Sequence, residues 1–252
     1  MKSNILFLFA TVLLTVISCK KEETLAEVTP PITNLTKDCK ITKVVQNQIT
    51  NGVSAHYKDY DYTYDTSGRL TNEDETCYIC SDGLRFKYVY TNDTVKEINK
   101  ITNKVIKIFV LNGQGYPKYS ASHYSTDTTR TYYTYNALGY LIKDSTYSTS
   151  PNVTTYEWVD GNNTKQINSG QTTYIDYLAD KSAALLPKRD PFGPLEAVKT
   201  GKGSKNLRNK IGNGSDSVTY QYQYNADGYV SKVIAPVTAT FTDERNFIYT
   251  CK

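Results

Sequence analysis

The fold of this chain is decided by residues 60–70, which read YDYTYDTSGRL. Tyrosines at alternating positions place their rings on one face of an extended strand, while Asp61 and Thr63 point to the other face. The residues that follow form a turn, because the side chain of Asp65 hydrogen-bonds its own backbone and Gly68 accepts a positive φ. This stretch therefore predicts a strand, a tight turn and a returning strand.

The same template recurs along the chain. Residues 133–141 read YTYNALGYL and residues 220–230 read YQYQYNADGYV, and looser copies begin at Phe86, Ile108, Tyr156 and Phe247. Copies that recur every 20 to 26 residues, roughly, indicate stacked hairpins. We expect an all-β fold: a large antiparallel meander sheet of about ten to twelve strands, curved or partly closed, with one loop and short-helix insert.

The composition agrees with a β-rich chain. Among 252 residues there are 23 Tyr but one Met and one Trp, so amphipathic rings must supply much of the buried surface. This excludes a helical fold rich in Ala and Leu. The net charge of +4 is too weak and too scattered to indicate a nucleic-acid partner.

The first residues have the layout of a secretory signal peptide over residues 1–18. The apolar run from Ile5 to Leu14 is shorter than the roughly 20 residues that a spanning helix needs. The small residues before Cys19 resemble the lipobox of bacterial lipoproteins, which implies that Cys19 is acylated and attaches the chain to a membrane. Residues 19–38 then read as a flexible tether, and residues 39–252 as a single β domain.

Residues 20–23, KKEE, resemble the signal that sends Bacteroidota lipoproteins to the cell surface; the alternative is a plain polar spacer. The template of residues 60–70 resembles the tyrosine-aspartate repeat of Rhs-type proteins. Over about residues 39–252 the chain resembles uncharacterised Bacteroidota lipoproteins of a domain family with a porin-like β fold. The resemblance implies an outer-membrane lipoprotein, exposed at the cell surface or facing the periplasm, and it implies no catalytic residues.

A long insert separates the last full repeat from the others, at about residues 178–216. Residues 178–186 predict a short helix that Pro187 stops, and residues 191–194 predict a turn. Five basic residues follow in 199–210, without the residue order of a phosphate-binding loop. We interpret them as a cationic surface loop; contact with an anionic glycan or lipopolysaccharide is the alternative.

Four cysteines remain after Cys19, and an even number in an exported chain indicates disulfides. Four cysteines allow three pairings, of which we expect Cys77 with Cys80 and Cys39 with Cys251. The spacing of Cys77 and Cys80 also fits a redox pair or half of a zinc site. The zinc site would require Cys39 and Cys251 to converge on the same point.

The sequence contains no motif that indicates an enzyme, a cofactor or a resident metal. His56 and His123 lie in strand-like stretches without a catalytic signature, and residues 73–75 read as a solvated turn. Two functions stay open besides a hydrolase: a binding module for a polysaccharide or an envelope protein, and a structural role in envelope assembly. The tyrosine rows form either the core of a curled sheet or an open binding face. The candidate ligand-binding residues are Tyr156, Trp158, Lys199, Lys202, Lys205 and Arg208.

Overall fold

A computed structural model describes residues 38–80, 83–123, 128–186, 198–214 and 216–251. The expected signal peptide and nearly all of the tether lie outside these residues. The described elements belong to one compact unit within residues 33–252. They are β1 (Cys39–Thr50), β2 (Val53–Tyr64), β3 (Leu70–Cys77), β4 (Arg85–Tyr90), β5 (Thr94–Asn99), β6 (Lys104–Leu111), β7 (Pro117–Ser122), β8 (Thr129–Tyr135), β9 (Leu141–Tyr147), β10 (Asn152–Val159), β11 (Asn162–Asn168), β12 (Gln171–Ser182), the 3₁₀ helix η1 (Ala183–Leu185), β13 (Asn206–Asn213), β14 (Asp216–Thr219), β15 (Gln221–Tyr224), β16 (Val230–Pro236) and β17 (Phe241–Cys251).

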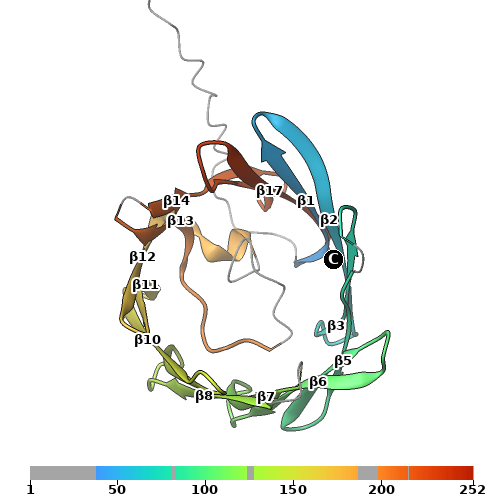
Figure 1. The fold of residues 1–252 in the computed structure, drawn as a ribbon, viewed down its shortest axis with the longest axis vertical. Coiled ribbons are helices and arrows are strands. Elements are labelled where there is room, and N and C mark those ends of the chain that lie inside the picture. Colours follow the sequence, from blue (N-terminus) through green and yellow to red (C-terminus); the bar gives the residue numbers. More distant parts are fainter. Residues whose placement is uncertain (1–37, 81–82, 124–127, 187–197, 215, 252) are drawn as a thin grey trace, which may run out of the picture. The chain divides into compact units, whose positions relative to one another are not determined.

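All 17 strands belong to one antiparallel sheet that is nearly closed into a barrel (Figure 1). Successive strands pair with each other, and β1 pairs with both β2 and β17, which brings the two ends of the sheet together. Strands β14 and β15 are parts of one extended segment, interrupted at Tyr220; β14 pairs with β13 and β15 with β16. The expected fold class is therefore confirmed.

The expected number of strands was too low. The count assumed one hairpin for each tyrosine row, but β13 lies within the insert that was expected to form a loop, and β12 continues into that insert. They form because a closed antiparallel sheet leaves no edge with unpaired backbone groups. Pairing between neighbours, rather than their own side-chain pattern, makes these segments strands.

The expected helix over residues 178–186 is wrong. Strand β12 continues to Ser182, whose backbone pairs with Asn206 of β13. The hydroxyl of Ser182 then accepts a hydrogen bond from the backbone N–H of Ala184 at 3.2 Å and caps a single 3₁₀ turn. Backbone pairing with β13 therefore outweighs the local helix propensity. The expected turn at residues 191–194 lies outside the described residues.

No helix among the described residues is long and apolar enough to cross a membrane.

The apolar core lies inside the barrel. Leu185 of η1, the following Leu186 and Val198 pack against buried side chains from β1 to β6 and from β13 to β17. Figure 1 shows η1 and the orange segment after residue 198 within the ring of strands. The tyrosine rows of β2, β4 and β15 face this interior, and Tyr62 is 4% exposed. The rings therefore form the core of a curled sheet.

Four of the turns share one hydrogen-bonding pattern. In the first, the carboxylate of Asp65 accepts from the backbone N–H of Arg69 at 2.9 Å, and the carbonyl of Asp65 accepts from Gly68 at 2.9 Å. The side-chain oxygens of three asparagines likewise accept from the backbone N–H four residues later; they are Asn112, Asn136 and Asn225. The Asx residue and the glycine of each template thus fix a turn at the same end of the barrel.

The last side chain of several aromatic rows donates a hydrogen bond to a backbone carbonyl of the neighbouring strand. The Tyr64 hydroxyl donates to the carbonyl of Ile41 at 2.6 Å, and Tyr90 donates to the carbonyl of Leu70 at 2.8 Å. Burial raises the pKa of both tyrosines to about 12. Equivalent bonds run from Tyr135 to Pro117, from Trp158 to Leu141 and from Tyr249 to Val230. The rings thus tie adjacent strands together as well as filling the interior.

Candidate functional site: a polar hollow inside the barrel

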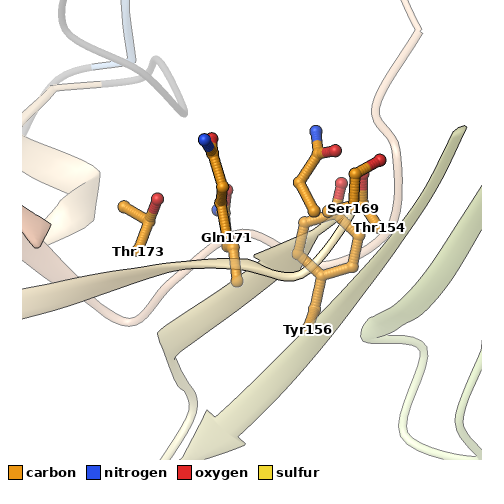
Figure 2. A pocket seen from close by; sticks show the side chains of 7 residues that line it. Thr154, Tyr156, Ser169, Gln171 and Thr173 are labelled. Atoms are coloured by element: carbon orange, nitrogen blue, oxygen red, sulfur yellow. The ribbon is translucent and has the colours of Figure 1, made fainter.

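Strands β10, β11 and β12 line a hollow of about 550 Å³, shown in Figure 2. All of its lining side chains carry hydroxyl or amide groups and none is charged. They are Thr154, Tyr156, Gln166, Asn168, Ser169, Gln171 and Thr173. The hollow therefore offers hydrogen-bond donors and acceptors without a fixed charge.

The strand register places these side chains on one face. Tyr156 pairs with Gln166, and Gln166 pairs in turn with Thr173 of the next strand. One pair further along, Asn168 lies between Thr154 and Gln171. Because successive residues of a strand alternate between faces, this set shares the inner face with Ile175, which is buried. The hollow is thus built on regular strands rather than on a loop.

The turn between β11 and β12 closes one side of the hollow. Ser169 and Gly170 have φ values of 48° and 84°, in the left-handed region. The Ser169 hydroxyl donates to Asn152 Oδ1 at 2.7 Å, which fixes this turn against β10. The tight turn lets β12 return directly beside β11.

Buried polar contacts hold the lining side chains. The Tyr156 hydroxyl donates to the carboxylate of Asp144 on β9. Gln166 donates to Asn163 Oδ1 at 2.8 Å, and Asn163 is 3% exposed and donates to the carbonyl of Glu157 at 3.1 Å. These bonds position the ring of Tyr156 and the amide of Gln166 before any ligand arrives.

Sequence reasoning located part of this site. Tyr156 lines the hollow, but Trp158 lies outside it: the indole N–H donates to Leu141, and the ring centroid is 4.5 Å from that of Tyr140. The amides of β11 and β12 were missed. Their signal was polar side chains at every second position, Gln166 with Asn168 and Gln171 with Thr173, and the sequence analysis followed aromatic rows instead.

Of the four basic candidate residues of the insert, the structure brings Lys202 close to the same aromatic ring as Trp158. The ammonium of Lys202 lies 5.6 Å from the Tyr140 ring centroid, so Lys202 and Trp158 both contact Tyr140. The backbone N–H of Lys205 donates to the carbonyl of Gly161 at 2.9 Å. Lys199 is exposed, and Arg208 lies on β13 opposite Tyr177. None of the four lines the hollow.

The cysteines lie in two pairs. Cys39 and Cys251 pair across β1 and β17, with an S–S distance of 1.96 Å and a sequence separation of 212. Cys77, the last residue of β3, pairs with Cys80 in the loop that follows. Cys39 and Cys251 thus join the first and last strands of the barrel. Among the described residues, no group of three or more His, Cys, Asp or Glu side chains is arranged to hold a metal ion.

Residues 73–75 do not form the expected solvated turn. They belong to β3, where Glu73 and Glu75 are 5% and 8% exposed. Tyr88 donates to Glu73 at 3.1 Å, and the ammonium of Lys58 lies 2.9 Å from Glu75. Glu73 and Glu75 occupy alternate positions of β3 and face the barrel interior. The hydrogen bond from Tyr88 and the ion pair with Lys58 offset the free-energy cost of burying the two carboxylates.

His56 belongs to a cluster on the outer face. Its Nε2 lies 2.7 Å from Asp59, whose carboxylate also accepts from Lys43 at 2.8 Å and from the Tyr78 hydroxyl at 3.1 Å. Burial by itself raises the pKa of Asp59, but these three hydrogen bonds together hold it below its ordinary value. His123 is exposed at the end of β7, with Nδ1 3.1 Å from the Thr128 hydroxyl.

No protein-family description and no curated protein matches this chain. Solved structures do match. A porin-like protein from Bacteroides uniformis superimposes with a TM-score of 0.65 at 14% identity, covering 84% of this chain and 98% of that one. The chain has a porin-like fold. A porin-like protein from Bacteroides vulgatus gives a TM-score of 0.53 at 14% identity, covering 84% and 99%.

The expected porin-like β fold is therefore confirmed. The resemblance of residues 60–70 to Rhs-type repeats stays a prediction. A TcdB2–TccC3 complex superimposes with a TM-score of 0.30 over 12% of its length, which carries no argument about fold.

Proposed function

We propose that this protein is a non-enzymatic binding module of the outer membrane that takes a neutral glycan into the hollow lined by β10, β11 and β12. The observation that carries the proposal is the lining: seven hydroxyl and amide side chains around about 550 Å³, with no charged group. Sugars present alternating donors and acceptors, which amides and hydroxyls can match. The Tyr156 ring adds a flat apolar surface at little cost in conformational entropy.

Binding in this hollow would be specific rather than tight. Each hydrogen bond between neutral groups contributes about 0.5–1.5 kcal/mol, because it replaces a bond to water. A catalytic role fits less well, since the one titratable side chain of the lining is Tyr156, whose hydroxyl already bonds Asp144. Hydrolysis of a glycoside needs a pair of carboxylates on either side of the bond.

We favour a plugged barrel over an open membrane pore. Leu185, Leu186 and Val198 fill the interior from the insert. On the outer face, Lys87, Arg130 and Lys143 are exposed where a lipid-facing band would be apolar. A basic side chain at the middle of a bilayer costs about 2–4 kcal/mol in such barrels. We therefore place the barrel in water, attached to the membrane through the lipid on Cys19.

The glycan proposal is tested with an array of neutral polysaccharides, probed with the full chain and with the double variant Asn168→Ala, Gln171→Ala. Loss of both amides should weaken retention at least tenfold. The matched control is Gln223→Ala, which removes an exposed amide from the outer face of β15. If no neutral glycan is retained, or if the hollow and control variants behave alike, the binding proposal fails and a structural role in the envelope is favoured.

The membrane attachment is tested separately by mass spectrometry of the mature protein. An N-terminal peptide that begins at an acylated Cys19 supports the tether. A mature chain that still begins at Met1 rules it out. Protease treatment of intact cells then distinguishes the cell surface from the periplasmic face, since surface-exposed protein is cleaved.

A further inference from the structure

Three tyrosines form a ladder on the outer face of β7, β8 and β9, away from the polar hollow. The Tyr119 and Tyr132 ring centroids lie 5.9 Å apart in a stacked arrangement, and those of Tyr132 and Tyr147 lie 5.6 Å apart, edge to face. Tyr132 and Tyr147 are 48% and 58% exposed. These rings belong to none of the interior rows.

The alternation along β8 establishes that this ladder faces outward. A side chain on Gly201 would lie 3.0 Å from the Tyr135 ring, so Tyr135 points toward the insert inside the barrel. The Tyr133 hydroxyl lies 3.0 Å from the hydroxyl of Ser120, which is 1% exposed. Tyr132 therefore points to the opposite face. Its direct partner on β7 is Tyr119, and Tyr147 lies on the next strand, opposite Arg130.

The described charged residues on the outer face of β7, β8 and β9 have one sign. Arg130 and Lys143 are exposed on β8 and β9, and neither forms an ion pair with a described residue. The acidic residue of β7, β8 and β9 is Asp144, which accepts the Tyr156 hydroxyl on the inner face. The outer face of these strands is therefore aromatic and positively charged.

We propose that this surface, made of Tyr119, Tyr132, Tyr147, Arg130 and Lys143, binds an acidic polysaccharide. Sugar rings lie against the exposed tyrosines, and the guanidinium of Arg130 and the ammonium of Lys143 pair with carboxylate or sulfate groups along the polymer. Surfaces that enter the acyl region of a membrane use Trp, Phe and Leu beside their basic residues. The hydroxyls of a tyrosine ladder instead suit a hydrated polymer.

The test measures binding of the full chain to polygalacturonate by affinity electrophoresis, with neutral dextran as the uncharged comparison. The double variant Tyr132→Ala, Tyr147→Ala should bind polygalacturonate at least tenfold more weakly. The matched control is Tyr174→Ala, an isolated outer tyrosine that is 53% exposed on β12. The variant Tyr132→Phe, Tyr147→Phe keeps the rings and should retain binding.

The charge requirement is tested with Arg130→Gln, Lys143→Gln, which should weaken binding and reduce its dependence on salt concentration. Equal affinity for dextran, or an equal loss in Tyr174→Ala, overturns the proposal. So does equal binding to vesicles of phosphatidylcholine and phosphatidylglycerol with the same dependence on the tyrosines, which would identify a lipid headgroup as the ligand.

The outer surface and the hollow are distinguishable. Asn168→Ala, Gln171→Ala should leave binding to polygalacturonate unchanged, while the outer variants leave binding of a neutral glycan unchanged. Because the side chains of the outer surface are exposed, their removal is expected to leave the melting temperature nearly unchanged. If an alanine variant unfolds, the phenylalanine and glutamine variants decide the outcome.

Discussion

At the scale of single residues, tyrosine does two tasks in this protein. The ring supplies apolar area to an interior with few aliphatic side chains, and the hydroxyl satisfies a backbone carbonyl of the neighbouring strand. Tyr64 shows both tasks: it packs against the core and donates to Ile41 at 2.6 Å. Phenylalanine would perform the first task alone.

Replacing Tyr64 by Phe should therefore destabilise the protein by about 1–2 kcal/mol, because a part-buried carbonyl loses its donor while the packing is kept. Urea unfolding followed by circular dichroism measures this change. Tyr132→Phe is the control, since that hydroxyl lies on the outer face, and should change the free energy of unfolding by less than about 0.5 kcal/mol. Equal effects of the two substitutions would show that the bond to Ile41 contributes nothing.

The carboxylate of Asp59 gives the protein a pH-dependent term. Its pKa is lower in the folded state than in the unfolded chain, because Lys43, His56 and Tyr78 donate to the charged form and outweigh the cost of burial. A lowered pKa stabilises the fold at pH values above the unfolded pKa of about 4, and that stability is lost as the pH falls through the folded value.

The melting temperature should therefore fall between about pH 5 and pH 3, and it should fall less in Asp59→Asn, which starts lower at neutral pH. Asp176→Asn, an exposed carboxylate on β12, is the control and should follow the wild-type curve. Parallel curves for Asp59→Asn and the wild type would contradict the assignment.

At the scale of elements, the repeated turns set where each hairpin reverses. Gly139 has a φ of 85°, and a side chain there would lie 3.2 Å from the Tyr116 ring. The glycine therefore serves both the left-handed backbone and a close approach between neighbouring turns. Gly113, in the preceding turn at this end, has open space around it.

Gly139→Ala should destabilise the protein by about 1–2 kcal/mol, the cost of a left-handed conformation for a residue with a side chain. Gly113→Ala should be neutral or slightly stabilising, because alanine restricts the unfolded chain. Thermal unfolding of the two variants compares the positions directly. A cost at Gly113 as large as that at Gly139 would contradict this account of the turn.

At the scale of the whole molecule, the barrel is closed where its first and last strands meet. Strands β1 and β17 pair from Cys39 and Cys251 to Thr50 and Phe241, and the cysteine pair lies at one end of this ladder. A covalent bond there restricts nearly the whole unfolded chain, because the two cysteines are 212 residues apart. The bond between Cys77 and Cys80 spans only two intervening residues and restricts the unfolded chain little.

Non-reducing peptide mapping should find Cys39 joined to Cys251 and Cys77 joined to Cys80. Replacing Cys39 and Cys251 by Ser should lower the free energy of unfolding by up to about 5.4 kcal/mol, the chain-entropy value for a loop of this length. Replacing Cys77 and Cys80 by Ser should cost much less. A peptide that joins Cys39 to Cys77 would refute this pairing.

The sequence by itself determined the local features of this protein. Alternating tyrosines over residues 60–64 require an extended strand with the rings on one face, and Asp65 with Gly68 requires a turn, because both rules act over a few neighbouring residues. The same local rules predicted an antiparallel all-β sheet and pointed to Tyr156 as a ligand-binding residue. They missed β13, which lies in the insert that was expected to form a loop.

The tertiary structure alone decided which face of each strand is inside. The pairing of β1 with β17 depends on every strand between them, so no local pattern specifies it. Closure turned the tyrosine rows and Glu73 inward and placed Gln166 and Gln171 around one hollow. Closure also explains why Tyr132 lies on the outer face while the adjacent Tyr133 points inward. Successive side chains of a strand alternate between the two faces, and closing the sheet makes one face the barrel interior.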